Sequence, residues 1–285
     1  DVLQTGQDGE QGNDQKTIRR GCGEQVFLLT SECPISPAIG IADGMGIASD
    51  RAPFWSNRMV RKFGNSFNLR SVENATRNTI TRSYMHRRLW LNVPGSIVLH
   101  VDEVDKPRLT EEEIRSFATA AAVLGGIMTF SEGSGSLDPE HCRVYRQLIA
   151  ISKDQPVGPA GKSLGTSMPA SGPGSAPASA PVSAPVSAST SGSAPALTSP
   201  SAPDLLSSAF PSVFRRSGLH QDYLALFNNA ASPHSMAVDL ERLFSTQTFP
   251  KQATDFWTGE KADIRGSILE MTVPPHGCRL FILPK

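Results

Sequence analysis

The sequence predicts an α/β fold with a parallel sheet, followed by a separate antiparallel β domain. Between residues 20 and 153, short apolar segments alternate with amphipathic helical ones, as in parallel α/β proteins. A Ser/Ala/Pro-rich segment then repeats Ser-Ala-Pro, and it has no charged residue between Lys162 and Asp204. Beyond it, apolar and polar residues alternate between turn residues, which is typical of antiparallel strands.

These composition changes divide the chain into four segments. Residues 1–19 are expected to be a flexible lead-in, since their first part is polar and glycine-rich. Residues 20–153 form the α/β part, residues 154–208 a disordered linker, and residues 209–285 the β domain. Because the chain opens with Asp1 rather than Met, we expect a fragment or a processed product.

The first half of the α/β part contains a strand, a helix and a broken strand. Gln25–Leu29 is short, apolar and β-prone, which predicts a buried strand. Leu69–Arg88 has apolar or small residues at helical spacing, which predicts an amphipathic helix that covers a sheet. Leu89–Leu99 predicts two short strands separated by a break at Pro94-Gly95.

The clearest local signal is a capping box at Thr110 and Glu113, which predicts the start of a helix. Its apolar face runs to Leu124, and Gly125 ends it. Residues 125–133 then predict a strand, and Pro139–Ile151 a helix.

The last segment predicts four antiparallel strands. They are expected at Asp222–Asn228, Met236–Leu240, 267–273 and 279–283, and the final two flank the turn Pro274-Pro275-His276-Gly277.

The overall composition excludes several classes of function. With 27 basic and 27 acidic residues there is no net charge to attract nucleic acid or an anionic membrane, and no apolar run reaches the roughly 18 residues of a membrane span. The four cysteines and six histidines show no metal-ligand spacing, so we expect no metal site. Eight basic residues between Arg58 and Arg88, Arg70 and Arg82 among them, are interpreted as a solvated or ion-paired face. Oligomeric state stays open.

Gly40–Trp55, GIADGMGIASDRAPFW, is the best candidate for a functional site. It places Asp43 and Asp50 in a glycine-rich region beside Trp55. A carboxyl group can exchange a proton with a glycosidic oxygen, and an aromatic ring can stack on a sugar. The composition alone also fits a surface loop with two solvated aspartates.

Phe27 to Leu137 resembles the C-terminal half of the catalytic TIM barrel of α-galactosidases of glycoside hydrolase family 36. The similar segments include SECPISPAIGIADGM, SDRAPFW, NRMVRKFG, ATRNTITRSYMHRRLWLN and LTEEEIRSFATAAAVLGGIMTFSEG. LALFN, VDLERL, DFWTGE and VPPHGCRLFIL likewise resemble the antiparallel β-sandwich that follows this barrel.

The resemblance implies a retaining mechanism with two aspartates, a substrate with a terminal α-galactosyl group, and no cofactor. It places Asp50 at the acid/base position and implies substrate-binding positions at Asp43, Trp55, Ser31 and Cys33. The family's nucleophile lies on an earlier strand in a Lys-x-Asp motif, and no such motif precedes these strands. The resemblance therefore implies that the nucleophile is absent and that the isolated chain is inactive.

Several positions depart from the family pattern. Gly46 stands where the family has an arginine four residues before the acid/base, and Thr30-Ser31-Glu32 replaces Gly-Cys-Gly. Asn92-Val93-Pro94-Gly95 replaces Asn-Asp-Pro-Asp, and Ser131-Glu132 replaces Ser-Asp. All four lie at the carboxyl ends of predicted strands, where barrel active sites are built. Two alternatives to the hydrolase stay open: an inactive carbohydrate-binding homologue, and a transglycosidase similar to raffinose synthase, which has the same fold and is not separated from the hydrolase by these residues.

Overall fold

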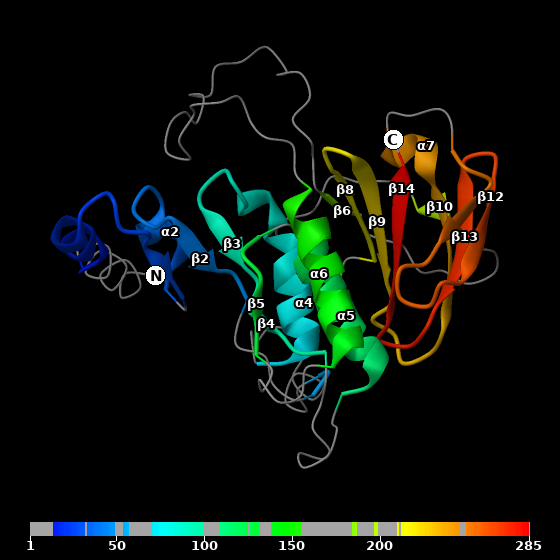
Figure 1. Cartoon of the computed structure of the whole chain (residues 1–285), viewed down its shortest axis with the longest axis horizontal. Coiled ribbons are helices and arrows are strands. Elements are labelled where there is room, and N and C mark those ends of the chain that lie inside the picture. The colour runs from blue at the N-terminus through cyan, green and yellow to red at the C-terminus, as the bar shows by residue number, and fades with distance from the viewer. Residues whose placement is uncertain are drawn as a thin grey trace, which may run out of the picture.

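The computed structural model is layered, with parallel strands on one side, helices in the middle and antiparallel sheets on the other side (Figure 1). The residues that the structure describes are 14–31, 33–48, 54–56, 70–99, 109–124, 126–131, 138–154, 210, 212–244 and 249–284, with the backbone of 184–186 and 197–198.

A three-stranded parallel sheet forms the first layer. Its order is β1 (Leu29–Thr30), β2 (Gly44–Gly46), β3 (Leu91–Val93), and the short helix α2 (Ile35–Ala38) connects the first two strands. Leu29 pairs with Gly44, which pairs in turn with Leu91, so the three strands end at the same edge. Residues 14–22 form a helix beside this sheet, and the expected boundary of the lead-in at residue 19 falls inside that helix.

A second parallel pair continues this layer. β4 (Ser96–Ile97) pairs with β5 (Thr129–Phe130), with Ser96 opposite Thr129. The chain breaks between β3 and β4 at Pro94-Gly95, where Gly95 has a φ of 105° that a side chain would disfavour. The predicted interruption of the strand at this dipeptide is confirmed.

Three helices cover the parallel strands. They are α4 (Val72–Thr81), which the 3-10 turn η1 (Ser83–Met85) follows, α5 (Glu111–Leu124) and α6 (Pro139–Lys153). The N-termini of α4 and α6 are each capped by a polar side chain. The hydroxyl of Ser71 accepts the Asn74 amide at 3.1 Å, and the carboxylate of Asp138 accepts the His141 amide at 2.8 Å.

Both hydrogen bonds of the capping box predicted for α5 are present. The amide of Thr110 donates to Oε2 of Glu113 at 2.7 Å, and the amide of Glu113 donates to Oγ1 of Thr110 at 3.3 Å. Gly125, expected to end the helix, lies outside the described residues.

The C-terminal part consists of two antiparallel sheets packed face to face. One has the order β14-β9-β8-β6 and the other β11-β12-β13-β10-β7, with the helix α7 (Leu240–Leu243) following β10. The strands are β6 (Ala184–Val186), β7 (Leu197–Thr198), β8 (Val213–Ser217), β9 (Gln221–Phe227), β10 (His234–Asp239), β11 (Gln252–Thr254), β12 (Lys261–Arg265), β13 (Ile268–Val273) and β14 (Cys278–Pro284). β6 and β7 lie within the Ser/Ala/Pro-rich segment, whose assignment as a linker stays a prediction.

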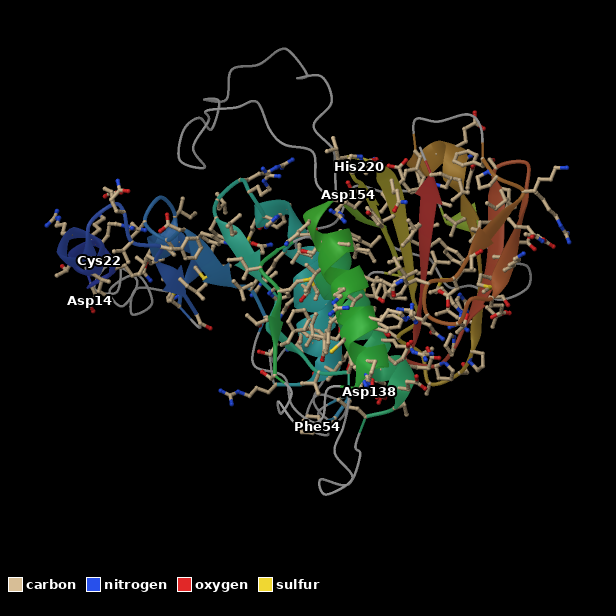
Figure 2. All side chains as sticks on the ribbon, in the orientation of Figure 1. Asp14, Cys22, Phe54, Asp138, Asp154 and His220 are labelled. Carbon is tan, nitrogen blue, oxygen red and sulfur yellow. The ribbon has the colours of Figure 1, made fainter. Side chains whose placement is uncertain are left out.

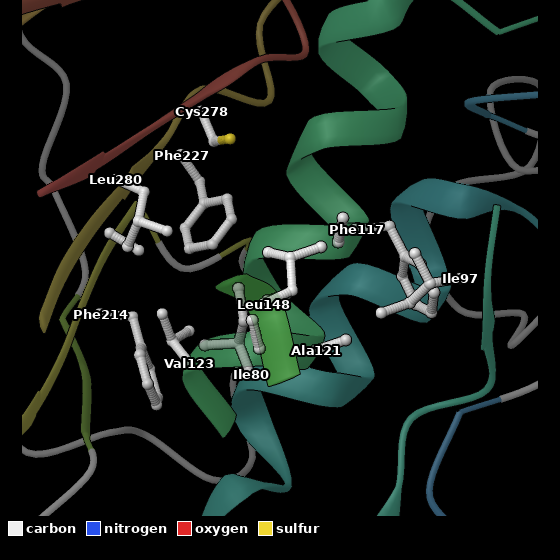
Figure 3. Close-up of a cluster of buried hydrophobic side chains, with 14 of the residues drawn as sticks. Ile80, Ile97, Phe117, Ala121, Val123, Leu148, Phe214, Phe227, Cys278 and Leu280 are labelled. Atoms are coloured by element: carbon white, nitrogen blue, oxygen red, sulfur yellow. The ribbon is translucent and has the colours of Figure 1, made fainter. Parts of the chain in front are cut away.

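One hydrophobic core joins the helices to the C-terminal sheets. Phe117 and Leu148 of α5 and α6 pack with Phe227 and Leu280 of β9 and β14, and all four are essentially inaccessible to solvent (Figure 3). A second cluster fills the space between the two sheets, and a third lies under β2 and β3. The helices therefore have apolar contacts on both sides.

The observed topology agrees with the predicted order of a parallel α/β part and an antiparallel β part. One prediction within it is wrong. Gln25–Leu29 was expected to be a buried strand, but only Leu29 belongs to β1, and Phe27 and Leu29 are 52% and 50% exposed. β1 is the edge of the described sheet, so one side of it has no neighbouring strand among the described residues.

Candidate functional site

The carboxyl ends of β1 and β2 open into a cavity of about 530 Å³. This volume lies in the range of small-molecule sites, and the carboxyl edge of a parallel sheet is where such sites form in α/β proteins. The cavity is lined by Cys33, Pro34, Ile35, Met45, Gly46, Ile47, Ala48, Arg70, Arg82, Met85 and Trp90.

The floor of the cavity is apolar and buried. Met45, Ile47 and Trp90 are each no more than 2% exposed. Nε1 of Trp90 donates to Oδ1 of Asn92 at 3.1 Å, which fixes the indole ring. A ligand in the cavity would therefore contact buried apolar side chains.

Two arginines supply the charge of the cavity. Arg82 follows the last residue of α4, and its Nη1 donates to the carbonyl oxygen of Ile47 at 2.5 Å. Burial lowers the pKa of Arg82 from its ordinary value. Arg70 lies at the exposed rim. None of the described residues that line the cavity carries a carboxylate.

Ser31 and Gly46 lie against each other at the ends of β1 and β2. A Cβ atom on Gly46 would lie 2.8 Å from Oγ of Ser31, closer than real Cβ contacts. An arginine at position 46, which the family resemblance would require, fits here only if Ser31 moves. Cys33 lines the same cavity, with its Sγ 3.8 Å from Sδ of Met45.

Asp43 lies at the opposite end of β2 from the cavity. Its carboxylate accepts the Leu28 amide at 2.8 Å and forms an ion pair with Arg19, which also donates to the carbonyl oxygen of Ile41 at 2.7 Å. Burial disfavours the charge, but these two donors outweigh it and hold the pKa of Asp43 below its ordinary value. In this structure Asp43 attaches the helix at residues 14–22 to the sheet. Its substrate-binding role stays a prediction.

Trp55 is also outside the cavity. Only 6% of it is exposed, and its ring stacks on the ring of His276 with centroids 5.0 Å apart and planes 10° apart. The carbonyl oxygens of Phe54 and Trp55 accept the amides of Val72 and Glu73, so this short segment is tied to the start of α4 (Figure 2, where Phe54 is labelled). Its predicted contact with a sugar would need this packing to open.

Asp50, the predicted acid/base, lies outside the described residues. In the sequence it follows Ala48, a residue that lines the cavity, by two positions. The chain has a single Lys-x-Asp triplet, Lys261-Ala262-Asp263, and it lies in β12, where Asp263 is exposed and accepts a hydrogen bond from Gln252. This triplet is therefore not the nucleophile motif of the barrel family.

The sequence alone did not identify the arginines of the cavity. Arg70 and Arg82 were interpreted as part of a solvated or ion-paired face, whereas the structure turns Arg82 inward against Ile47. In the sequence Arg82 lies inside the predicted helix Leu69–Arg88, whereas α4 ends at Thr81, so no sequence pattern indicated that its side chain reaches the cavity. Among the described residues, no group of three His, Cys, Asp or Glu side chains could hold a metal ion.

Residues 216–283 match the family model described as the alpha galactosidase C-terminal beta sandwich domain. This segment comprises β9 to β14 almost entirely, together with the last residues of β8. No helix in the part of the chain that the structure describes is long and apolar enough to cross a membrane.

Three solved structures have a similar fold. The β-L-arabinopyranosidase of glycoside hydrolase family 27 from Geobacillus stearothermophilus, in complex with arabinose, has a TM-score of 0.61 at 12% identity, covering 96% of this chain and 54% of that one. Alpha-galactosidase I from Mortierella vinacea has a TM-score of 0.51 at 14% identity, covering 86% and 54%. The alpha-galactosidase from Saccharomyces cerevisiae has a TM-score of 0.50 at 14% identity, covering 86% and 60%.

These comparisons confirm the predicted fold class, the C-terminal half of a TIM barrel followed by an antiparallel β-sandwich. The chain spans 54% to 60% of the length of these three proteins.

Proposed function

We propose that the chain carries part of the sugar site of a retaining α-galactosidase of glycoside hydrolase family 36, which acts on terminal α-galactosyl groups. The observation that carries this proposal is the position of the cavity. It opens at the carboxyl ends of the parallel strands, in a chain whose C-terminal segment matches the α-galactosidase sandwich. The arabinose complex of the family 27 enzyme adds support, because that protein shares the fold and binds a sugar.

Asp50 has the role of acid/base in this proposal. A retaining enzyme needs a second carboxylate about 5 Å from the first, to attack the anomeric carbon while the acid protonates the leaving oxygen. None of the described residues that line the cavity can supply it. We therefore expect the chain by itself to bind a galactoside without hydrolysing it.

Two measurements on the purified chain test the proposal. Calorimetric titration with galactose should give saturable heat at millimolar sugar, and a chromogenic α-galactoside should show no release of the chromophore above buffer. Absence of saturable binding would overturn the sugar site. Hydrolysis that Asp50→Asn abolishes would overturn the expected inactivity and support Asp50 as acid/base.

A second candidate function is an inactive carbohydrate-binding homologue. It is favoured by Gly46, which stands where the family resemblance would place an arginine and where any side chain would require Ser31 to move. If the chain is a binding homologue, the Asp50→Asn variant should bind galactose with the same affinity as the unsubstituted chain. In an enzyme site, by contrast, Asp50 would contact the glycosidic oxygen, and the variant should weaken binding of the aryl galactoside more than binding of galactose.

A further inference from the structure

Three sulfur-containing side chains line the cavity at the ends of β1 and β2. Cys33 comes from the loop between β1 and α2, Met45 is the middle residue of β2, and Met85 is the last residue of η1. Met45 and Met85 are 2% and 5% exposed, whereas Cys33 is half-buried. The cavity therefore combines one accessible thiol with two buried thioethers.

The sulfur atoms of Cys33 and Met45 are in contact. The thiol of Cys33 donates to Sδ of Met45 at 3.8 Å, and the hydroxyl of Thr30 donates to the same Sδ at 3.4 Å. Two sulfur atoms that bind one metal ion at about 2.3 Å each, with an angle between tetrahedral and trigonal, are about 3.8 to 4.0 Å apart. The observed separation therefore suits one metal ion in place of the thiol proton.

The ligand types indicate the kind of ion. Thiolate and thioether sulfurs are soft ligands that select copper(I), whereas zinc is bound by thiolate, imidazole and carboxylate groups. A monovalent ion on the thiolate of Cys33 also gives a neutral complex, which costs less to bury beside Ile47 and Trp90 than the positive complex that zinc would form. The expectation of no metal site depended on cysteine and histidine spacing, which does not include methionine sulfur.

We propose that the cavity binds one soft monovalent cation, copper(I) or silver(I), between Sγ of Cys33 and Sδ of Met45, with Met85 as the third ligand. On binding, the thiol of Cys33 gives its proton to solvent, a metal–sulfur bond replaces the S–H bond, and no electron is transferred. The site is independent of the proposed sugar function, since it needs neither a carboxylate nor a galactoside.

Silver(I) is the first probe, because it has the charge and the ligand preference of copper(I) and is stable in air. The full chain carries Cys22→Ser and Cys142→Ser, so that its remaining thiols are Cys33 and the fully buried Cys278. After incubation with silver nitrate in chloride-free buffer and gel filtration, we expect one silver ion per chain by mass spectrometry. The melting temperature should rise with the silver concentration, because the ion binds the folded state.

Methionine variants assign the ion to the cavity. Met45→Leu keeps the volume and the apolar character of a buried side chain. Loss of even an outer partner of a metal ligand weakens binding about 10- to 100-fold, so Met45→Leu should weaken silver binding about 10-fold or more in a competition titration against glutathione. Met85→Leu should weaken it too. Met271→Leu is the matched control, because Met271 is partly buried in the sandwich and does not line the cavity.

A lone thiol also binds silver(I), so a second comparison isolates the contribution of the methionine. In a chain with Cys33→Ser and Cys142→Ser, Cys22 remains, and its Sγ contacts the backbone oxygens of Arg19 and Gly23 at 3.7 and 3.8 Å. This chain should bind silver(I) about 10-fold or more weakly than the chain that keeps Cys33. Its affinity should not change with Met45→Leu.

A third measurement needs no substitution at a methionine. The chain with Cys22→Ser and Cys142→Ser is grown with selenomethionine, loaded with copper(I) under anaerobic conditions, and studied by X-ray absorption at the copper edge. We expect both sulfur and selenium neighbours, since the thiolate of Cys33 and the side chain of Met45 bind the same ion. Zinc added to the same chain should not displace the copper.

Several outcomes would overturn the proposal. They are the absence of a bound ion in the chain that keeps Cys33, silver binding that survives Cys33→Ser, an affinity that Met45→Leu leaves unchanged, a copper spectrum without selenium neighbours, and displacement of copper by zinc. The galactose titration without metal tests the sugar site separately, so failure of one proposal does not decide the other.

Discussion

His276 and Glu113 form one of the side-chain contacts that connect the two parts of the molecule. Nδ1 of His276, in the turn between β13 and β14, lies 2.9 Å from Oε1 of Glu113 in α5. Ser116, one turn further along α5, donates from its hydroxyl to the backbone oxygen of His276 at 2.8 Å. His276 has a φ of 51°, which is unfavourable for a residue with a side chain, and these contacts together with the Trp55 ring hold it there.

Glu113→Ala should destabilise the protein by about 1 to 2 kcal/mol, because Glu113 also accepts the Thr110 amide in the capping box. Glu111→Ala is the matched control on the same helix turn, since Glu111 is exposed and pairs only with Arg115 among the described residues. Urea unfolding measures the free energy of unfolding of both variants. Equal losses in the two variants would contradict the role of Glu113 as a buried connection.

Asp154 should make the stability depend on pH. Its carboxylate accepts the amides of Leu219, His220 and Gln221 and the hydroxyl of Tyr223, at one end of the β8–β9 hairpin (Figure 2). Burial disfavours the charge, but the Tyr223 hydroxyl and these amides outweigh it and hold the pKa of Asp154 below its ordinary value of 3.8.

The direction of the effect follows from this lowered pKa. A carboxyl group that is more acidic in the folded state adds stability above its unfolded pKa, and this stability is lost as the pH falls through the folded pKa. Asp154→Asn should therefore cost about 1 to 2 kcal/mol near neutral pH. The difference from the unsubstituted chain should shrink below about pH 4. Urea unfolding at several pH values measures this difference, and a difference that does not change with pH would contradict the assignment.

Gly46→Arg should destabilise the protein by up to about 1 kcal/mol, since the new Cβ meets the hydroxyl of Ser31, an exposed residue whose side chain must change its rotamer. The double variant Gly46→Arg with Ser31→Gly should recover part of this loss. Thermal unfolding of the two single variants and the double variant measures the coupling. If the stability change of the double variant equals the sum of those of the two single variants, Ser31 does not limit the space at position 46.

The β1 edge should promote self-association. Val26, Phe27, Leu29 and Ile39 are each about half exposed, and they lie on or next to the edge strand of the described sheet. Phe27→Lys with Leu29→Lys should reduce the concentration dependence of the sedimentation coefficient. Leu219→Lys, at an equally exposed leucine in the sandwich, serves as the control. If both variants act alike, the association does not involve the β1 edge.

The elements that the sequence predicted well have local causes. The capping box of Thr110 and Glu113 specifies the start of α5, and Pro94-Gly95 specifies the break between β3 and β4. In each case the residues that determine the structure are within a few positions of the element itself, so the pattern is readable without knowing the rest of the fold.

The candidate site was predicted less completely, because its residues meet only through the tertiary structure. Arg82 reaches the cavity by bonding Ile47, which is 35 positions earlier in the chain. Trp55 was expected beside a sugar, yet its stacking partner His276 comes from the sandwich. Neither contact has a sequence period or a short motif that could have revealed it.

The core that α5 shares with β9 and β14 has a consequence for how the protein unfolds. The segment that matches a family model begins at residue 216, but Phe117, Ala121 and Leu148 belong to the same buried cluster as Phe227 and Leu280. Separating the sandwich from the helices would expose this cluster to water, so each half would lose part of its buried interior. We expect calorimetry to show a single cooperative heat absorption peak rather than two, since the boundary drawn by sequence similarity is not a boundary between independent folding units.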